Sequence, residues 1–520
     1  MSRPRLHAIA TILFVEVFSF AYCIRGLGFY QDDWALLEHV YTGTGFSFWH
    51  GLKTLWSAGV VARPTSVFLY SALCALGGLS PLPYQVALLA ANALAAIACF
   101  LWLERLTGDR RLALLAAVLG AVYPIHPATH HWMTNILQPL AHALAFAALT
   151  VHVSWSKGRA WRPGLACGAL FATAFLTKET VAFLPLLALV SSYERLRTEE
   201  VSPQAAVRRL PADIAPLLAG FAVGILWQWV IKRAEQPLSL RWSIGWTATV
   251  YGSGLDSLTR QCFQLLRRTI GFFFASADDA SLLLLALSAV VAAFLLSRAQ
   301  AAGDPNRRRG PRLALLLAGA NFVAAYAPYA ASGAYEPQVV GMMSRTNEVG
   351  AWTAALLLAA GLCWLEARVL ERADAWPRLP ARALLPAAAG LILAAFTATN
   401  WFIARQWAAS WTLQQDILAR VARRAPQLPP KATLLVTGVP LLVNGTAVFH
   451  ESNHGDWPFA AAFRLKTGRA DVKTALPTGR LTAGPDGIIE RDGERLVRTY
   501  PYDGLYLFEL ESDKLTRIVR

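Results

Sequence analysis

Long apolar runs dominate roughly the first 400 residues of the chain and limit what it can fold into. The runs are roughly 15 to 24 residues long and alternate with short loops that carry Lys and Arg. A helix of about 20 mainly apolar residues crosses the hydrocarbon core of a bilayer. Because 55% of the 520 residues are hydrophobic and only 16% are charged, the sequence predicts an all-α polytopic membrane protein.

The net charge of +15 does not point to nucleic acid. The Lys and Arg residues lie in the loops between apolar runs, where membrane topology alone accounts for them. The cysteines are scattered, mostly within or at the edges of apolar runs, and lack the CxxC spacing of a metal site. They predict neither a disulfide framework nor a zinc site; the six are Cys23, Cys74, Cys99, Cys167, Cys262 and Cys363.

The positions of the basic residues set the expected topology. Arg3 and Arg5 place the N-terminus in the cytoplasm, so the first span, about residues 7–26, leads to an external loop. No small-residue cleavage pattern follows this run, and we expect it to be a retained membrane anchor. The later basic clusters are also expected in the cytoplasm, which requires an even number of spans between successive clusters. These clusters are 105–111, 157–162, 195–209, 298–312 and 368–382.

This parity rule decides two ambiguous regions. Only one of two neighbouring apolar runs can cross before the first of those clusters, so residues 83–104 are assigned as a span and 64–80 as a juxtamembrane or re-entrant helix. Residues 163–192 must instead form two short spans that turn at Lys178-Glu179. Each would cover only about 21 to 24 Å of the roughly 30 Å hydrocarbon core, so we expect the turn in a protein-lined cavity below the outer surface.

About eleven spans are expected in total, and an odd number puts the C-terminus outside the cell. The remaining spans are about 111–124, 137–154, 213–231, 280–297, 313–330, 348–366 and 383–402. In the outer loop 232–279, the segment 255–274 mixes arginines with apolar residues and predicts an interfacial amphipathic helix.

The character of the chain changes after a transmembrane domain of residues 1–402. Residues 403–429 predict an amphipathic linker helix that prolines interrupt. Residues 430–520 predict a small extracytoplasmic α+β domain, a size that can hold its own core. Its expected strands are 432–437, 487–490, 496–500 and 504–510, with a hairpin turn at Arg491-Asp492-Gly493. This domain would either hold an acceptor or cover the site.

The polar side chains that suit chemistry all fall at the outer ends of the expected spans. They are Asp32 and Asp33, Arg63, the histidines His126, His130 and His131, Lys178 and Glu179, and Arg345. The loops on the other side are basic and contain no Gly-rich phosphate-binding motif. A site on the outer face has no ready access to ATP or nucleotide sugars, so an activated substrate would have to arrive attached to a lipid.

In order and position these motifs resemble the GT-C superfamily of membrane glycosyltransferases, such as the polyprenyl-phosphate-dependent protein mannosyltransferases and lipid A aminoarabinose transferases. Those enzymes carry an acidic pair in the first external loop, an Arg-Pro or His-Pro-Pro helix after it, and a Lys or Lys-Glu turn near the seventh helix. The resemblance covers about residues 7–195, and the later spans match only in general layout. Asp33 stands where these relatives often have Glu, which leaves open which carboxylate acts.

The resemblance implies inverting transfer of a sugar from a polyprenyl-phosphate-linked donor, as co-substrate, to a lipid, glycan or protein acceptor. It places this reaction at the periplasmic face of a bacterial inner membrane, with no nucleic-acid partner. A positioned carboxylate takes the proton of the attacking hydroxyl, and fixed cations stabilise the leaving phosphate. Neighbouring helical residues point about 100° apart, so the two carboxylates have different roles.

The expected roles follow from position in the motifs. Asp32 is the base, and Asp33 is an orienting residue or the ligand of a divalent metal, the one cofactor for which the motifs leave room. Lys178, Arg63 and Arg345 bind the donor phosphate. The supporting residues are Glu179, His126 and His131.

Each motif also has a purely structural interpretation. The acidic pair is also typical of a solvated helix start, and Lys178-Glu179 of an ion pair that caps a helical hairpin. Arg63 and Arg345 also suit snorkelling to lipid head groups, and the histidines suit interfacial packing. Glu16, within the first span, is expected to satisfy a neighbouring helix and is left out of the site.

Two other functions remain as alternatives. One is a ligase or polymerase that transfers a whole oligosaccharide from a diphosphate-linked donor. The other is a non-enzymatic transporter or flippase. Transporters tend to have repeated halves and ionisable groups near the bilayer midplane, whereas this sequence shows no repeat and its polar groups lie toward one surface.

Overall fold

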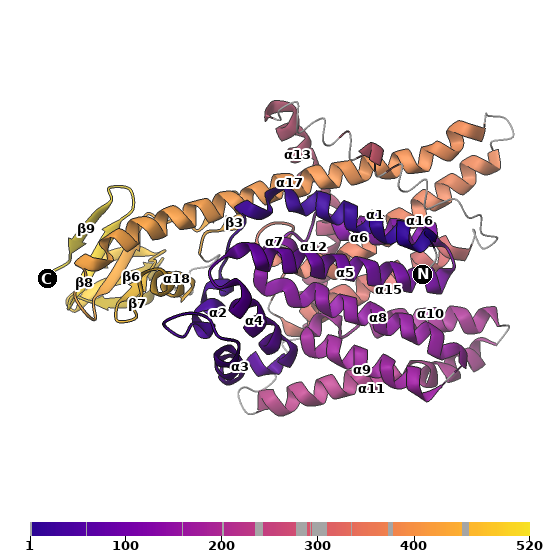
Figure 1. Ribbon diagram of the computed structural model, residues 1–520, viewed down its shortest axis with the longest axis horizontal. Coiled ribbons are helices and arrows are strands. Elements are labelled where there is room, and N and C mark those ends of the chain that lie inside the picture. The colour runs from indigo at the N-terminus through magenta and orange to yellow at the C-terminus, as the bar shows by residue number, and fades with distance from the viewer. Residues whose placement is uncertain are drawn as a thin grey trace.

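The structure is a computed structural model, and it describes residues 3–58, 60–158, 160–199, 202–233, 243–276, 286, 289–291, 293, 309–333, 335–372, 378–449 and 457–520. A bundle of helices occupies most of the molecule, and a small region with strands lies at one end of it (Figure 1). This arrangement confirms the expected fold class, a helical polytopic protein followed by a small α+β region.

Helices make up nearly all of the described chain before residue 425. The first nine are α1 (Arg3–Phe20), α2 (Asp32–Val40), α3 (Phe48–Ser57), α4 (Pro64–Gly77), α5 (Pro81–Thr107), α6 (Arg110–Val122), α7 (Ala128–His131), α8 (Leu137–Gly158) and α9 (Trp161–Thr177). They are followed by α10 (Pro185–Thr198), α11 (Pro203–Arg233), α12 (Ile244–Asp256), α13 (Cys262–Ser276), α15 (Arg309–Ser332), α16 (Glu348–Arg372), α17 (Arg378–Arg424) and α18 (Trp457–Thr467).

The two ends of the bundle carry different polar residues. At one end, which we call the carboxylate end, Asp32 interacts electrostatically with Lys178 and Arg345. At the other, which we call the arginine end, Arg105, Arg195 and Arg312 line one cavity. The N-terminus lies at the arginine end, because Arg5 pairs with Glu104 one residue before Arg105, and the strands lie beyond the carboxylate end (Figure 1).

The expected break at residues 178–179 is confirmed. α9 ends at Thr177, Lys178 has an extended backbone, and α10 begins at Pro185. Lys178 is at the carboxylate end and Arg195 is at the arginine end, so α9 and α10 run in opposite senses through the bundle. At 1.5 Å per residue they are about 26 and 21 Å long.

Local sequence explains the sharp ends of α4, α5 and α6. Pro64 and Pro81 occupy the first turns of α4 and α5, where a proline costs no backbone hydrogen bond. Gly108 ends α5 with φ of 71°, a conformation that glycine adopts without strain. The Asp109 side chain accepts hydrogen bonds from the first turn of α6, at 2.9 Å from the backbone nitrogen of Arg111. These caps make α5 and α6 a tight hairpin at the arginine end.

Six helices among the described residues are long and apolar enough to cross a membrane by length and composition. They are Pro81–Thr107, Met133–Ser156, Pro203–Ile231, Gly310–Ser332, Met342–Val369 and Leu385–Gln427. Each includes most or all of an expected span. α4 is only 14 residues long, about 21 Å, which agrees with a helix that does not cross. Most of the expected span 280–297 lies outside the described residues, and the total of eleven stays a prediction.

The expected interfacial segment 255–274 is helical. It comprises the end of α12, a π-helical turn at Ser257–Gln261, and most of α13. Its position at a membrane surface stays a prediction.

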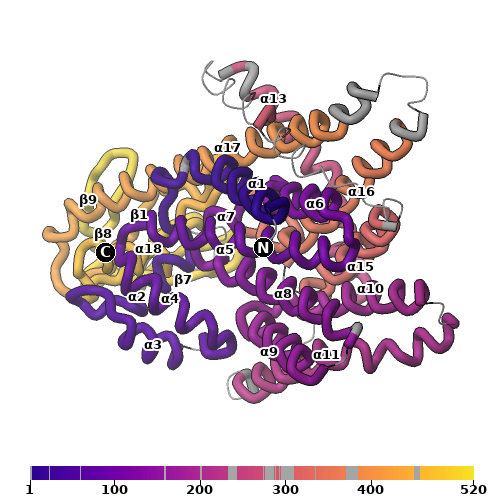
Figure 2. The backbone as a smooth tube through the Cα atoms, turned by 45° about the vertical axis from the view of Figure 1, so that its right-hand side comes forward, coloured from indigo at the N-terminus to yellow at the C-terminus, as the bar shows by residue number. Residues whose placement is uncertain are grey.

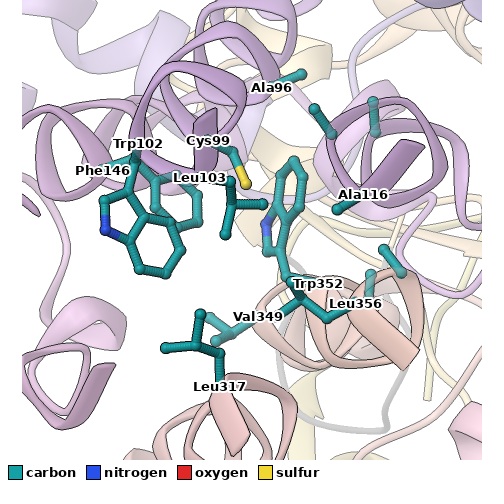
Figure 3. Packing of buried hydrophobic residues seen from close by; sticks show 14 of the residues in the cluster. Ala96, Cys99, Trp102, Leu103, Ala116, Phe146, Leu317, Val349, Trp352 and Leu356 are labelled. Carbon is teal, nitrogen blue, oxygen red and sulfur yellow. The ribbon is translucent and has the colours of Figure 1, made fainter. Parts of the chain in front are cut away.

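Large aromatic side chains hold the centre of the bundle together (Figure 3). The Phe146 ring stacks on Trp102 and meets Trp352 edge to face, with both centroid distances 5.5 Å. Trp352 lies against Gly120 of α6, where an added Cβ would overlap the indole. Aromatic pairs of this kind add about 0.5–1.5 kcal/mol beyond area burial. The packing of α5, α6, α8 and α16 therefore depends on the complementary shapes of these side chains as well as on their hydrophobicity.

α17 is one continuous helix of 47 residues that joins the bundle to the C-terminal region (Figure 2). It covers both the expected last span and the expected linker helix, and the segment with Pro426 ends it. The helix that the sequence divides at residue 402 therefore has no structural break there.

The C-terminal region contains the expected strands. Its main sheet has the order β4-β1-β8-β9, with β1 parallel to β4 and β8, and β9 antiparallel to β8. The strands are β1 (Thr433–Thr437), β2 (Leu442–Val443), β3 (Thr446–Ala447), β4 (Lys473–Ala475), β5 (Arg480–Ala483), β6 (Gly487–Asp492), β7 (Arg495–Pro501), β8 (Leu505–Glu509) and β9 (Lys514–Arg517). The hairpin predicted at residues 491–493 joins β6 to β7, with Gly493 at φ of 59°.

Gly220 provides a test of the close contact between α9 and α11. An added Cβ there would overlap the carbonyl oxygen of Gly168 and lie 3.0 Å from the backbone nitrogen of Ala172. Because backbone atoms cannot rotate away, Gly220→Ala should destabilise the protein by about 1–3 kcal/mol. Thermal unfolding in detergent measures this loss. Gly319→Ala is the control, since an added Cβ there meets no atom within 4 Å; equal shifts for the two variants would contradict the packing.

Candidate functional site

Asp33 ties two loops together at the carboxylate end. One carboxylate oxygen accepts a hydrogen bond from the backbone nitrogen of Tyr30 at 2.9 Å, and the other accepts from that of Thr134 at 3.0 Å. The residue is 0% exposed. Burial raises the pKa of this carboxyl, and the hydrogen bonds from Tyr30 and Thr134 oppose that rise. Asp33 therefore positions the loop rather than facing open space.

The backbone before Asp32 is strained. Gln31, which precedes α2, has φ of 42° and ψ of −114°, values that a non-glycine residue rarely adopts. Strain of this kind costs on the order of 1–3 kcal/mol and persists only where surrounding contacts enforce it. The two backbone hydrogen bonds to Asp33 are such contacts, and they fix the direction in which Asp32 projects.

The extension of α17 holds the same loop from the other side. The Tyr30 hydroxyl donates to the backbone oxygen of Trp407 at 2.8 Å, and the Trp34 indole nitrogen donates to Gln414 at 2.9 Å. The Trp34 ring also stacks on Trp411, at a centroid distance of 5.8 Å. The acidic pair is thus bracketed by two aromatic residues that both dock on one helix.

Asp32 differs from Asp33 in its surroundings. Its side chain is partly buried, and it forms no salt bridge with any residue that the structure describes. Burial raises the pKa of the Asp32 carboxyl, while the charges of Arg345 and Lys178 act in the opposite direction. The Asp32 carboxyl therefore differs from that of Asp33, whose two oxygens both accept backbone hydrogen bonds.

Arg63 is not a free cation. Its guanidinium forms a two-pronged ion pair with Glu179, in which Nε lies 2.8 Å from Oε2 and an Nη contacts the other oxygen. This pair joins the start of α4 to the turn between α9 and α10. Arg63 and Glu179 thus largely balance each other's charge next to Lys178.

Lys178 and Arg345 form no salt bridge with any residue that the structure describes. Burial, together with the charges of Arg63 and Arg345, lowers the pKa of Lys178 to about 7. The Arg345 guanidinium lies over the rings of Trp132 and Tyr335, at 5.0 and 5.1 Å from their centroids. A phosphate oxyanion near both cations would favour the charged form of Lys178.

The histidine segment contacts this arrangement through its backbone and through Trp132. The carbonyl of His131 accepts a hydrogen bond from Gln85, and Trp132, the next residue, supports Arg345. His126 is buried, with Nδ1 2.7 Å from the Thr129 hydroxyl. The ring of His131 is buried, and its nitrogens have no hydrogen-bond partner among the described residues. Supporting roles for His126 and His131 stay predictions.

His130 and Glu16 meet behind the loop. The His130 ring stacks on Phe20, and its Nδ1 lies 3.6 Å from a carboxylate oxygen of Glu16. Glu16 is fully buried and therefore faces the bundle interior, as its position within the first span required.

A divalent metal at Asp33 does not fit this arrangement well. Among the described residues there is no group of three His, Cys, Asp or Glu side chains placed to hold a metal ion. Both Asp33 oxygens already accept backbone hydrogen bonds. The donor set therefore suits the orienting role of Asp33, and no reaction step below involves a metal.

Several residues of the site were not singled out from the sequence. Trp407, Trp411 and Gln414 follow an i, i+4, i+7 spacing that places them on one helical face, a signal present in the sequence. Gln138, whose side chain donates to the backbone oxygen of Arg345 at 2.8 Å, and Tyr335 carry no local signal. Their role depends on segments that are distant in the chain.

Part of the chain matches a model of a known protein family. Residues 49–206 match the family model described as dolichyl-phosphate-mannose-protein mannosyltransferase. The matched segment contains Arg63, the histidine motif and the Lys178-Glu179 turn. It confirms the resemblance to GT-C membrane glycosyltransferases that the ordered motifs predicted. A search of curated proteins finds no match.

Two solved structures are also similar to this chain. One is ArnT from Cupriavidus metallidurans bound to undecaprenyl phosphate, with 13% identity, a TM-score of 0.39, and coverage of 90% of this chain and 85% of that chain. The other is the archaeal oligosaccharyltransferase AglB from Archaeoglobus fulgidus in complex with an inhibitory peptide and a dolichol-phosphate, with 13% identity, a TM-score of 0.45, and coverage of 90% and 64%.

The contrast between the two aspartates can be tested through stability. In Asp33→Asn the side-chain amide offers one acceptor oxygen for two backbone N–H groups, so one buried donor loses its partner. The expected loss is about 1–3 kcal/mol in the free energy of unfolding. Asp32→Asn should leave the unfolding midpoint close to that of the wild type. Thermal unfolding in detergent compares the two, and equal destabilisation would contradict the assignment of Asp33 as the structural carboxylate.

Proposed function

We propose that the protein is a membrane glycosyltransferase that moves a sugar from a polyprenyl-phosphate-linked donor to an acceptor hydroxyl. One observation carries the proposal: at one end of a membrane bundle, Asp32 interacts electrostatically with two cations, Lys178 and Arg345. None of the three forms a salt bridge with any residue that the structure describes. Such an arrangement suits proton abstraction next to a leaving phosphate. The family match over residues 49–206 supports glycosyl transfer in general.

The reaction would proceed by direct displacement. The acceptor oxygen attacks the anomeric carbon from the side opposite the phosphate, and its proton passes to a carboxylate oxygen of Asp32. The bond between the anomeric carbon and the phosphate oxygen breaks, and the polyprenyl phosphate leaves with the bonding electron pair. The attack from the opposite face inverts the anomeric configuration.

The cations would act on the leaving group. Negative charge develops on the phosphate as the bond breaks, and Lys178 and Arg345 would stabilise it. Trp132 and Tyr335 hold the guanidinium of Arg345 in place, so little reorganisation is needed during the reaction. Arg63 would act mainly through Glu179, by fixing the turn that carries Lys178.

The acceptor side of the proposal rests on the C-terminal region. α18 packs on α2, the helix that begins with the two aspartates, and Arg464 of α18 forms a two-pronged ion pair with Glu38 of α2. We propose that this region helps to hold or enclose the acceptor, which is a lipid, glycan or protein, on the periplasmic side of a bacterial inner membrane. Deletion of the C-terminal region would also expose α2 to solvent. Point variants at Arg464 therefore test its role in acceptor binding more specifically.

Asp32→Asn is the direct test of the mechanism. The variant should reduce transfer about 10²- to 10⁴-fold, because the acceptor hydroxyl loses its general base. The assay follows release of undecaprenyl phosphate from a panel of undecaprenyl-phosphate hexoses and pentoses by purified protein in proteoliposomes. Asp256→Asn is the matched control, since Asp256 lies on α12 in an i,i+4 pair with Arg260. Turnover of Asp32→Asn near the wild-type rate would remove Asp32 from the mechanism.

Mass spectrometry of the same products separates the alternatives. A mass increase of one sugar on the acceptor supports monosaccharide transfer, and a whole oligosaccharide supports the ligase or polymerase. Movement of donor lipid across the liposome membrane without any glycosidic product would favour a flippase.

The pH dependence of the reaction follows from the raised pKa of Asp32. The base acts when deprotonated, so kcat/KM should be lost as the pH falls through this pKa. Because burial raises it, the acidic limb should lie above the ordinary Asp value of about 3.9. Arg345→Gln removes the first of the charges that lower this pKa and should move the limb to still higher pH. A limb that stays in place in this variant would show that another group is titrating.

A further inference from the structure

The arginine end of the bundle contains a cavity that the proposed transfer does not use. It has a volume of about 450 Å³ and lies between the ends of α5, α8, α10 and α15. This size is within the range of ligand-binding pockets. The carboxylate end is at the opposite ends of the same helices, since Lys178 precedes α10 and Gln138 begins α8.

Two of the three arginines that line the cavity have no ion-pair partner among the described residues. These are Arg105 near the end of α5 and Arg312 near the start of α15. Arg195, in contrast, contacts Asp213 and lies 2.9 Å from Glu199. The charge of Arg195 is therefore balanced, whereas Arg105 and Arg312 form no ion pair with any acidic residue that the structure describes.

Buried hydrogen-bond donors also line the cavity. Ser192 is 2% exposed, and its hydroxyl has no hydrogen-bond partner among the described residues. Nε of Arg195 is also buried and has no hydrogen-bond partner among them. A buried donor without a partner costs about 1–3 kcal/mol, so a ligand acceptor there would be favourable. His152 places Nε2 2.8 Å from the carbonyl oxygen of Asp213, so Nε2 must carry the proton that it donates.

These features define the chemistry of the ligand. Free guanidinium groups and unpaired donors suit a phosphate oxyanion, for which Arg provides forked hydrogen bonds. Glu194 also lines the cavity and disfavours a ligand with several negative charges, such as a nucleoside triphosphate. A singly charged phosphodiester, or a monoester that also carries an amine or hydroxyls, fits both the cations and the lone carboxylate.

We propose that this cavity is a binding site for a phosphate ester, supplied either by a phospholipid head group or by a soluble metabolite. The cavity lies where helices end. Helices that cross a bilayer end near its head-group layer, and basic pockets between helices at that level bind anionic head groups. Binding would join the ends of four helices, one of which, α10, follows the turn that holds Lys178. The cavity would lie in the cytoplasmic leaflet if the carboxylate end is periplasmic. That placement alone rests on the proposed function.

The binding test uses full-length protein that is purified in detergent and depleted of lipid. Thermal unfolding is measured with added glycerol 3-phosphate, and native mass spectrometry counts lipids retained from liposomes of phosphatidylglycerol and phosphatidylethanolamine. Arg105→Gln combined with Arg312→Gln should weaken binding of the responding probe at least about tenfold, because two charged contacts are lost. Ser192→Ala should weaken it severalfold while leaving the unliganded unfolding midpoint unchanged or higher.

A matched pair of arginines controls for general charge effects. Arg208 and Arg209 are exposed on α11, near the same end of the bundle, and do not line the cavity. Arg208→Gln with Arg209→Gln should bind as the wild type does. Retained lipid identifies a head-group site, and a midpoint shift with glycerol 3-phosphate alone identifies a soluble ester.

Two outcomes would overturn the site. One is that neither probe binds the wild type, and the other is that the control pair loses as much binding as the cavity pair. Both readouts are independent of sugar transfer, so an inactive transferase would not change them.

Discussion

The hydrogen bonds from Tyr30 and Thr134 to the buried carboxylate of Asp33 are the interaction on which the candidate site depends. They join the loop after α1 to the loop after α7, which are about a hundred positions apart in the chain. A buried carboxylate is costly unless donors satisfy it, and these two donors also hold the strained backbone at Gln31. Asp32, which lies between Gln31 and Asp33, interacts electrostatically with Lys178 and Arg345.

The carboxylate end contains both a closed ion pair and charged side chains without a salt bridge. Arg63 and Glu179 neutralise each other in a fork, which gives the turn a rigid frame. Lys178 and Arg345 lack such partners among the described residues, and Asp32 lies between solvent and protein near them. An uncompensated group in a partly buried setting is expensive to maintain, which is why such groups mark functional sites.

The C-terminal region is not separated from the site by a flexible linker. α17 runs without interruption from the bundle to residue 424, and buried residues of α2 and α4 share one apolar cluster with strands β1 and β8. Arg464 and Glu38 reinforce this contact. One continuous helix therefore connects the strands to the bundle, and the expected boundary at residue 402 falls within that helix.

The sequence by itself determined the helical membrane class, the break at Lys178, the separation of basic and acidic ends, and the strands after residue 430. Hydrophobic run length and the distribution of Arg and Lys are local properties, so they can be interpreted without knowledge of the packing. The same reasoning predicted Arg63 as a phosphate ligand, but it could not show that Arg63 forms an ion pair with Glu179. Only the tertiary structure decided which aspartate is buried, which cations lack partners among the described residues, and that Trp407 and Gln414 hold the loop. Each of these depends on atoms from segments more than a hundred residues apart in the chain.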